Sequence, residues 1–259
     1  MTDMIDPRAV VHLNAELAEN VKVGPFTIIG PDVQIDSGTL IGPHVVIKGP
    51  TTIGRDNEIY QFTSIGEDPQ DKKYADEVTR LQIGDRNVIR EFCTMHRGTQ
   101  QDKGVTLIGN DNLFMAYTHV AHDCQIGNHV IMANGASIAG HVHIGHHAIL
   151  GGFTLVHQFT QIGEYSFSAM GSAITQDVPP FVMVGGRPTR PHGINSIGME
   201  RNGMPPEVIR QIRKAYKILY KNNLRLEDAI EEMEDMAGES NELSNMVSFL
   251  RNVTRGILR

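Results

Sequence analysis

The stretch that decides the fold is "VGPFTIIGPDVQIDSGTLIGPHVVI", which runs from Val23 to Ile47. An aliphatic residue recurs there at every sixth position, and the residue four places after each one is small or β-branched. The aliphatic column is Val23, Ile29, Ile35, Ile41 and Ile47, and the second column is Thr27, Val33, Thr39 and Val45. A sustained six-residue period predicts a parallel β-helix, in which three short strands make one coil and each coil stacks on the next.

The same period organises most of the chain. It begins at Ile5, runs without a gap to Ile65, and after two interruptions continues to Ile174. The interruptions lie near residues 67–82 and 97–107 and contain "GEDPQDKKYADEVTR" and "RGTQQDKG". Because the period resumes after each, we predict external loops of one domain, and such loops on a regular scaffold commonly carry function.

A second, helical domain is predicted at the C-terminal end. We expect the ladder to stop near Val178, because the prolines of "QDVPP" lack a backbone donor. The segments "PPEVIRQIRKAYKILYK", "RLEDAIEEMEDMAG" and "ESNELSNMVSFLRNV" then have helical periodicity and start or stop signals. The predicted fold is mainly β, with a parallel β-helix over residues 1–190 and a small α-helical domain over residues 191–259.

Composition excludes several classes of protein. A formal charge of −7 argues against a general nucleic-acid binder. The chain has only short apolar runs and no secretory signal at its start, so we expect no membrane insertion and a cytoplasmic location. Cys93 and Cys124 both fall in the small column, which predicts buried apolar packing residues.

Histidines gather in "THVAHDCQIGNHVIMANGASIAGHVHIGHH", Thr118–His147, and none of the twelve in the chain occupies an inward column. We therefore expect them on the outside of the coils. A coil of three hexads repeats every 18 residues, so His122 stacks beneath Gly140 and Gly140 beneath Gln158, about 4.8 Å apart. Asp123 likewise stacks beneath His141. The 18-residue spacing therefore predicts three groups in one column: the base His122, the glycine Gly140, whose N–H can face a ligand, and the amide of Gln158.

Metal binding is the alternative for these histidines. Zinc needs three or four convergent ligands, and the lattice stacks only one histidine pair, His129 with His147. We therefore predict no metal within one subunit, while a site shared between subunits stays open. Most of the other histidines on the coils are expected to be plain surface residues: His12, His44, His129, His143, His146 and His147.

Several further motifs are specific to one protein family. The hexads together with "NEIYQFTSIGE", "QDKKY", "IREFCTMHRGT", "HVAHDCQIGNH", "AGHVHIG", "VHQF", "QDVPPFV" and a tail ending in "TRGILR" cover essentially the whole chain. The chain resembles the family of acyl-carrier-protein-dependent UDP-N-acetylglucosamine O-acyltransferases, which begins lipid A synthesis. The resemblance implies a Gram-negative bacterial source and a homotrimer of left-handed β-helices with active sites between subunits. It also implies transfer of an (R)-3-hydroxyacyl group to the sugar 3-hydroxyl.

The resemblance assigns roles residue by residue. His122 is the general base, Asp123 orients it, and Gly140 supplies the oxyanion-hole N–H. The implied sugar, phosphate, acyl and nucleotide contacts are Asp71, Lys73, His119, His141, His157, Gln158, Asn195 and Arg201, and Met170 occupies the position that limits acyl-chain length. The acyl donor is carried on the phosphopantetheine of acyl carrier protein, so no separate cofactor is expected.

The charge pattern of the tail has two readings. Six basic residues against one acid lie between Pro205 and Arg225. They are either a solvated helix face or a dock for an acidic partner. With the resemblance, Arg210, Arg213, Lys214 and Lys217 become the expected dock for the carrier protein.

The sequence departs from the family at two positions in "GINSIGMERNG". Ile197 stands where the family commonly has an acid, and Asn202 stands where it has an arginine. These departures leave open a related hexapeptide acyltransferase with another acceptor, such as a 3-amino UDP-sugar, or with acetyl-CoA as donor. A non-catalytic scaffold that binds a nucleotide sugar is the further alternative, against which the intact "AHDC" and "AGHV" motifs argue.

Overall fold

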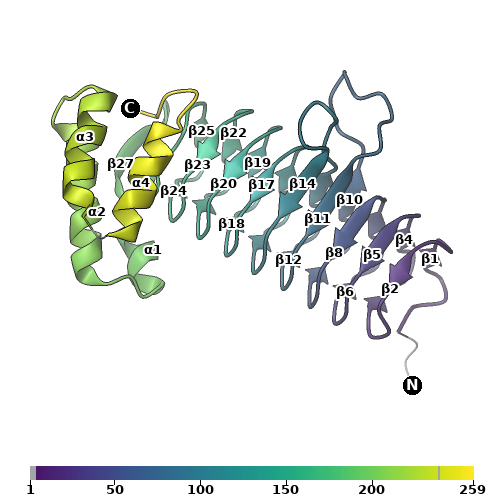
Figure 1. Ribbon diagram of the computed structural model, residues 1–259. Helices are drawn as coiled ribbons and strands as arrows, with labels where there is room; N and C mark the ends of the chain where they lie inside the picture. Colours follow the sequence, from purple (N-terminus) through teal and green to yellow (C-terminus); the bar gives the residue numbers. More distant parts are fainter. Residues whose placement is uncertain (1–3, 239) are drawn as a thin grey trace.

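The computed structural model describes residues 4–238 and 240–259, and three sheets of very short strands form a prism along most of that length (Figure 1). Sheet 1 contains β1 (Val10–Val11), β4 (Ile28–Ile29), β7 (Val46–Ile47), β10 (Ser64–Glu67), β13 (Thr94–His96), β16 (His119–Val120), β19 (Ser137–Ile138), β22 (Leu155–Val156) and β25 (Ala173–Ile174). Sheet 2 contains β2 (Glu16–Leu17), β5 (Val33–Ile35), β8 (Thr51–Ile53), β11 (Arg80–Ile83), β14 (Val105–Ile108), β17 (Gln125–Ile126), β20 (His143–Ile144) and β23 (Gln161–Ile162). Sheet 3 contains β3 (Lys22–Val23), β6 (Leu40–Ile41), β9 (Glu58–Ile59), β12 (Val88–Ile89), β15 (Leu113–Phe114), β18 (Ile131–Met132), β21 (Ile149–Leu150), β24 (Phe167–Ser168), β26 (Val182–Gly185) and β27 (Arg190–Ile194).

The six-residue period is realised as predicted. Residues 18 apart pair between neighbouring coils, as Val11 does with Ile29 and Ile138 with Val156. The spacing lengthens where the loops are inserted, so Ile65 pairs with Met95 and Met95 with Val120, and it shortens to 16 residues where Ser168 pairs with Val184. Both inward columns are buried from Val23 onward, whereas Ile5 on the first coil is exposed. Cys93 and Cys124 lie among the buried residues with no exposed surface.

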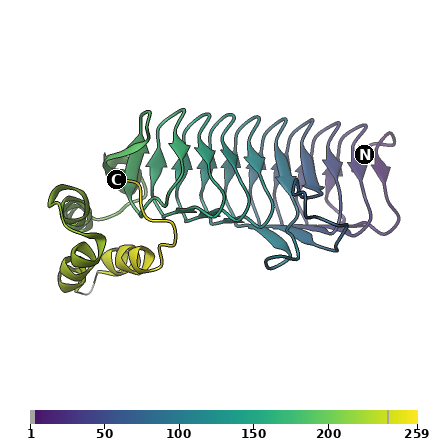
Figure 2. The same ribbon diagram turned by 90° about the horizontal axis from the view of Figure 1, so that it is seen from above.

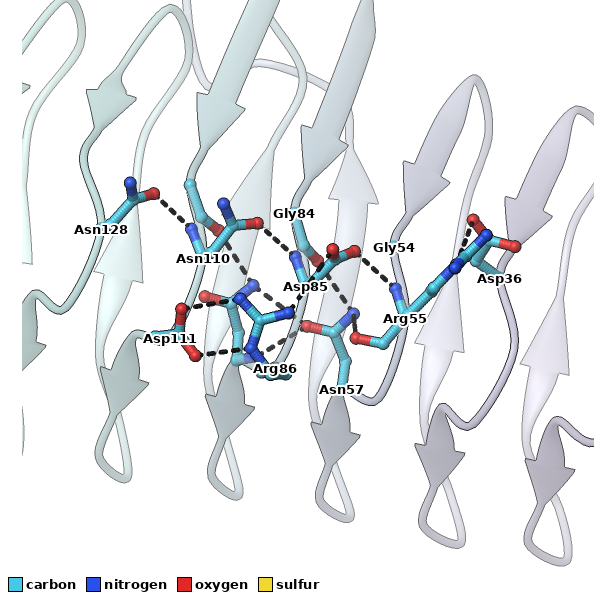
Figure 3. Close-up of polar contacts among 12 residues, drawn as sticks. Asp36, Gly54, Arg55, Asn57, Gly84, Asp85, Arg86, Asn110, Asp111 and Asn128 are labelled. Carbon is cyan, nitrogen blue, oxygen red and sulfur yellow. Dashed lines mark hydrogen bonds and ion pairs between the residues drawn. The ribbon is translucent and has the colours of Figure 1, made fainter.

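Polar side chains satisfy the backbone where sheet 2 turns into sheet 3. Asn57 donates to the Gly84 carbonyl and accepts from the Asn87 backbone N–H, and Asn110 accepts from the Asp85 N–H (Figure 3). The exposed Arg86 bridges to Asp111 on the next coil. Because a strand two residues long leaves its turns without ladder bonds, this column of asparagines replaces the missing partners.

The ladder does not stop at Val178, and that expectation was wrong. Val178 still bridges to Ile162, after which β26 pairs in parallel with β24 and β27 folds back antiparallel on β26. The two prolines lie in a turn between strands, where the ladder needs no N–H from them, so they do not end it. The predicted boundary after residue 190 falls inside β27, and the division into two domains stays a prediction.

Four helices follow and pack at one end of the prism (Figures 1 and 2). They are α1 (Ser196–Arg201), α2 (Pro206–Lys221), α3 (Leu226–Ala237) and α4 (Asn241–Arg251). The periodicity predicted α2, α3 and α4, although the quoted third segment begins at Glu239, which lies outside the described residues; it did not predict α1. The chain end returns to the prism, where Leu258 donates to the Asp177 carbonyl. None of the described helices combines the length and apolar character that a bilayer-spanning segment requires.

Candidate active site

The predicted catalytic residues lie where sheet 1 turns into sheet 2. His122 and Asp123 form the turn between β16 and β17, and one coil further on Gly140 and His141 form the turn between β19 and β20. Both external loops leave the prism at this same edge, between β10 and β11 and between β13 and β14. The fold therefore brings two irregular segments to the edge that carries the histidine column.

His122 and Asp123 form a hydrogen-bonded pair. His122 Nδ1 lies 2.8 Å from Asp123 Oδ2. Because an ionised carboxylate only accepts, the proton belongs on Nδ1, which leaves the lone pair of Nε2 available as a base. The His122 side chain is 13% exposed and Asp123 is 1% exposed, so the pair is accessible only from the His122 side.

The Asp123 carboxylate is held ionised by its donors. The Thr99 backbone N–H donates to Oδ1 at 2.8 Å, and the Thr99 hydroxyl donates to Oδ2 at 2.7 Å. Burial acts to raise the pKa of Asp123, but the His122 ring N–H, the two Thr99 donors and the nearby His141 together lower it below its usual value. A negative charge at Asp123 stabilises the imidazolium that forms when His122 accepts a proton.

Gly140 lies directly against His122. A Cβ built on Gly140 would meet His122 Cε1 at 2.5 Å and Nε2 at 2.7 Å, so any side chain at this position would displace the base. Within the described residues, the Gly140 N–H donates to no other backbone group. The 18-residue stacking of His122, Gly140 and Gln158 is supported by the His141 N–H donating to the His122 carbonyl, and the Phe159 N–H to that of Gly140.

His141 shares the site with His122. The two rings are 5.1 Å apart and nearly perpendicular, and His141 stacks on Phe159 with 4.3 Å between centroids. His141 Nδ1 lies 2.9 Å from Asp102 Oδ2, and its Nε2 lies 3.8 Å from Asp123 Oδ2. His141 thus lies between two carboxylates from different segments of the chain.

Two further histidines adjoin the column. His119 contacts the Thr94 hydroxyl at 2.7 Å and meets the His96 ring edge-on at 5.0 Å. His96 is only 3% exposed, which corrects the expectation that every histidine lines the outside. It follows the inward Met95 at the base of both external loops, next to Arg97, whose N–H donates to the Glu67 carbonyl. Burial lowers the pKa of His96 to about 4 and, with His122 nearby, lowers that of His119.

The loop between β10 and β11 carries Asp71 and Lys73. The Asp71 carboxylate accepts the Lys73 backbone N–H at 3.0 Å, and the Lys73 side chain is exposed. The buried Arg97 guanidinium anchors this loop by donating to the Gly66 carbonyl at 2.6 Å, to the Tyr74 hydroxyl at 3.1 Å and to the Asp68 carboxylate. Neither Asp71 nor Lys73 has a recorded side-chain contact with His122 in the described part of the chain.

The remaining predicted residues lie around this centre or beyond it. His157 and Gln158 are exposed on the coil above Gly140, and Met170 is 78% exposed on the coil after that. Asn195 caps α1, with Oδ1 accepting from the Gly198 N–H and Nδ2 donating to the Tyr165 carbonyl, while Arg201 is exposed at the end of α1. The four basic residues predicted to dock the carrier protein, Arg210, Arg213, Lys214 and Lys217, are exposed on α2.

One group of potential metal ligands exists in the described part of the chain. Donor atoms of His122, Asp123 and His141 lie within 4.8 Å of one another, a set that the stacking argument did not count. Both oxygens of Asp123 already accept hydrogen bonds, from Thr99 and His122. A metal would have to displace those donors, so the donor set fits a metal poorly.

Thr99, Asp102, Arg97 and His96 are the site residues that the sequence did not reveal. His96 ends β13 and the other three lie on the loop between β13 and β14, where the 18-residue lattice does not apply. The only signal was the polar composition of "HRGTQQDKG" next to a break in the period.

Two family models match the chain. One, described as Udp N-acetylglucosamine O-acyltransferase; Domain 2, matches residues 177–258, and one described as Bacterial transferase hexapeptide (six repeats) matches residues 14–49 and 106–140. Curated relatives include the acyl-[acyl-carrier-protein]–UDP-N-acetylglucosamine O-acyltransferases of Alkalilimnicola ehrlichii, 56% identical over 98% of this chain and 99% of that protein, and of Pseudomonas putida, 54% identical over the same shares.

Solved structures agree with these relatives. LpxA from Acinetobacter baumannii has a TM-score of 0.97 and 45% identity, covering 99% of this chain and 100% of that one. The UDP-N-acetylglucosamine acyltransferase of Francisella novicida has a TM-score of 0.97 and 41% identity, covering 99% and 94%. These matches confirm the fold class, a left-handed parallel β-helix of hexapeptide repeats with a C-terminal helical part. On this combined similarity in sequence, structure and repeats, the chain belongs to the family of acyl-carrier-protein-dependent UDP-N-acetylglucosamine O-acyltransferases.

Proposed function

We propose that this chain transfers an (R)-3-hydroxyacyl group from acyl carrier protein to the 3-hydroxyl of UDP-N-acetylglucosamine, the first reaction of lipid A synthesis. The observation that carries the proposal is the His122–Asp123 pair directly beside Gly140. A base whose free nitrogen faces an open backbone N–H is the arrangement that acyl transfer requires.

The reaction follows from this geometry. His122 Nε2 removes the proton from the sugar hydroxyl, whose oxygen then forms a bond to the thioester carbonyl carbon. The negative charge that develops on the carbonyl oxygen is stabilised by the Gly140 N–H. The carbon–sulfur bond then breaks, and His122 returns the proton to the departing pantetheine thiolate. A positioned base contributes roughly 10²–10⁴ in rate and one oxyanion donor roughly 10²–10³.

Neutral neighbours suit this mechanism. A positive charge next to His122 would oppose its protonation, and the lowered pKa values of His96 and His119 keep both rings uncharged near neutral pH. Asp123, which stays ionised, is the charge that matches an imidazolium at His122. The charge in direct contact with the His122 ring is therefore the carboxylate of Asp123.

We assign substrate contacts to the residues around the base. Asp71 and Lys73 on their exposed loop bind the sugar and its phosphates, and His119, His141, His157 and Gln158 line the sugar and acyl sites. Arg201 and Asn195 contact the nucleotide. Because both polar groups of Asn195 already bond within the chain, its contact uses the remaining lone pair or N–H.

Met170 is proposed to limit the acyl chain. Its side chain is 78% exposed in the single chain, at a turn beyond the catalytic coil, so a second subunit or the acyl group itself has to cover it. A bulky side chain there favours a medium-length hydroxyacyl group.

A homotrimer is proposed from the apolar surface. The edge where sheet 3 turns into sheet 1 carries a column of stacked rings, Phe26, His44, Phe62, Phe92 and Tyr117, with centroids 4.8 to 5.2 Å apart. Phe153 continues this edge at 67% exposure, and sheet 1 beside it exposes Val10, Ile28 and Leu155. Exposed apolar surface of this extent marks an interface, and the catalytic edge bounds the same sheet.

The helical tail is proposed to receive the carrier protein. Four exposed cationic residues of α2 form a positive face for an acidic partner: Arg210, Arg213, Lys214 and Lys217. We retain the division into a β-helical domain to residue 190 and a helical domain from 191 as part of this proposal.

The test is the mass of the product formed from UDP-N-acetylglucosamine and a graded panel of (R)-3-hydroxyacyl carrier proteins. We expect an O-acylated nucleotide sugar that peaks at a medium chain length and persists with a chelator present. Product formed only from acetyl-CoA, or only with a 3-amino UDP-sugar, would instead favour the altered-specificity alternative raised by Ile197 and Asn202.

A further inference from the structure

We propose that Asp102 is a positioning residue that forms a second histidine–carboxylate pair with His141 and fixes the direction of its free nitrogen in the site. The inference rests on the proposed function, which it deepens by adding an orienting residue from the external loop between β13 and β14. Sequence stacking could not find this pair, since the two residues come from segments 39 positions apart.

Three contacts define the His141 ring. Asp102 Oδ2 lies 2.9 Å from Nδ1, the Phe159 ring stacks on one face at 4.3 Å and 9° between planes, and Asp123 Oδ2 lies 3.8 Å from Nε2. A carboxylate accepts only, so the Asp102 contact places a proton on Nδ1. Rotation of the ring by half a turn would break that hydrogen bond, so Asp102 selects one orientation.

The selected orientation points Nε2 toward the catalytic pair. His122 meets His141 edge-on at 5.1 Å, and both rings approach the same Asp123 oxygen. A substrate group bound beside His122 therefore meets His141 Nε2 in a fixed direction. Such fixed contacts act on the reacting geometry, where a displacement of about 1 Å costs up to roughly 10² in rate.

The loop supports this role through a second attachment. Thr99, three residues before Asp102, holds both oxygens of Asp123. One short loop thus orients both members of the histidine column, with Thr99 acting through Asp123 and Asp102 acting directly on His141. The charged and titratable groups that face His141 are Asp102, Asp123 and His122. His143 lies nearby, and burial followed by the charge of Lys103 lowers its pKa.

The kinetic test uses four variants. Asp102→Ala removes the acceptor, Asp102→Asn retains an acceptor oxygen without the charge, His141→Ala removes the ring, and Gln101→Ala is the matched control on the adjacent exposed position. We expect Asp102→Ala to lower kcat about ten-fold with a smaller change in KM. Asp102→Asn should recover most of the loss, and Gln101→Ala should match the wild type.

A double variant decides whether Asp102 acts through His141. If it does, Asp102→Ala combined with His141→Ala should be no slower than His141→Ala alone. Losses that multiply in the double variant, or an unchanged kcat in Asp102→Ala, would overturn the proposal.

A second readout does not depend on activity. Nitrogen-15 NMR of the histidine rings, with His141 identified by its absence in His141→Ala, should find Nδ1 protonated in the wild type and a changed tautomer population in Asp102→Ala. An Nε2-protonated His141 in the wild type would refute the pair. If the wild type transferred no acyl group but showed the Nδ1 proton, the proposed function would fail while the pair stood.

Discussion

At the scale of single residues, the site depends on the partner that each histidine ring contacts. His122 is paired with an ionised Asp123, whereas the buried His96 contacts the His119 ring and the half-buried His119 contacts the Thr94 hydroxyl. Residue types alone did not separate these cases. The two kinds of histidine differ because the ends of the external loops cover His96. Those loops are not part of the 18-residue repeat, so the repeat could not predict this burial.

The burial of His96 predicts a pH dependence of stability. Its pKa falls from 6.5 to about 4 in the folded chain, so the unfolded chain binds its proton more readily. The stabilisation from the neutral ring is therefore complete above about pH 6.5 and is lost as the pH falls toward 4, with a slope of at most about 1.4 kcal/mol per pH unit.

Denaturant unfolding at fixed protein concentration, in steps between pH 7 and pH 4, measures this slope. His96→Gln should flatten it, and the exposed His12→Gln should retain the slope of the wild type. An identical slope in His96→Gln and wild type would show that His96 is not buried in its neutral form.

At the scale of elements, the two external loops complete the site, and Arg97 joins them. It follows β13 at the start of one loop, and its guanidinium holds Gly66 in β10 together with Asp68 and Tyr74 of the other loop. The coils themselves were predictable, because each strand follows from the period. The loops could be predicted only as interruptions of the period. Across them the paired residues are no longer 18 apart: Ile65 pairs with Met95, 30 residues on, and Met95 pairs with Val120, 25 residues on.

Loss of the Arg97 anchor should weaken substrate binding. Arg97→Met frees the loop that carries Asp71 and Lys73, and binding must then order it. We expect KM for UDP-N-acetylglucosamine to rise about ten-fold, equivalent to roughly 1.4 kcal/mol of ordering, with a smaller change in kcat.

Steady-state kinetics with the nucleotide sugar as the varied substrate measures this effect. Arg90→Met is the matched control, since Arg90 is exposed and, among residues 4–238 and 240–259, its side chain pairs only with its neighbour Glu91 and the Tyr60 ring. An equal rise in KM in both variants would mean that loop anchoring is not the cause.

At the scale of the whole molecule, the chain is a prism with helices at one end (Figure 2). The period predicted the prism and the helical pattern predicted α2 to α4. Two features were not predicted from the sequence, each for a local reason. Helix α1 is only six residues long and depends on the Asn195 cap, and β26 resumes the ladder after prolines that lie in a turn. Handedness is a third, since a six-residue period is the same for either hand.

The aromatic edge predicts the assembly state. Tyr117 and Phe153 have positive φ values of 65° and 55°, a conformation that aspartate tolerates, so replacing both with Asp keeps the turns while adding charge to the interface. We expect the double variant to shift from trimer toward monomer in size-exclusion chromatography with light scattering, with an unchanged circular dichroism spectrum.

Leu13→Asp serves as the control, since Leu13 is 99% exposed and lies on another edge of the prism. It should retain the assembly state of the wild type. A double variant that remained fully trimeric would place the interface elsewhere.

The central claim is that His122 is the base of an acyl transfer to a nucleotide sugar. The most direct measurement is mass spectrometry of the product formed from UDP-N-acetylglucosamine and (R)-3-hydroxyacyl carrier protein, by the wild type and by His122→Ala at equal concentration and equal assembly state. We predict an O-acylated nucleotide sugar from the wild type and a rate at least about 10² lower from the variant. Equal product from both proteins would contradict the mechanism, and no product from the wild type with any donor would contradict the function.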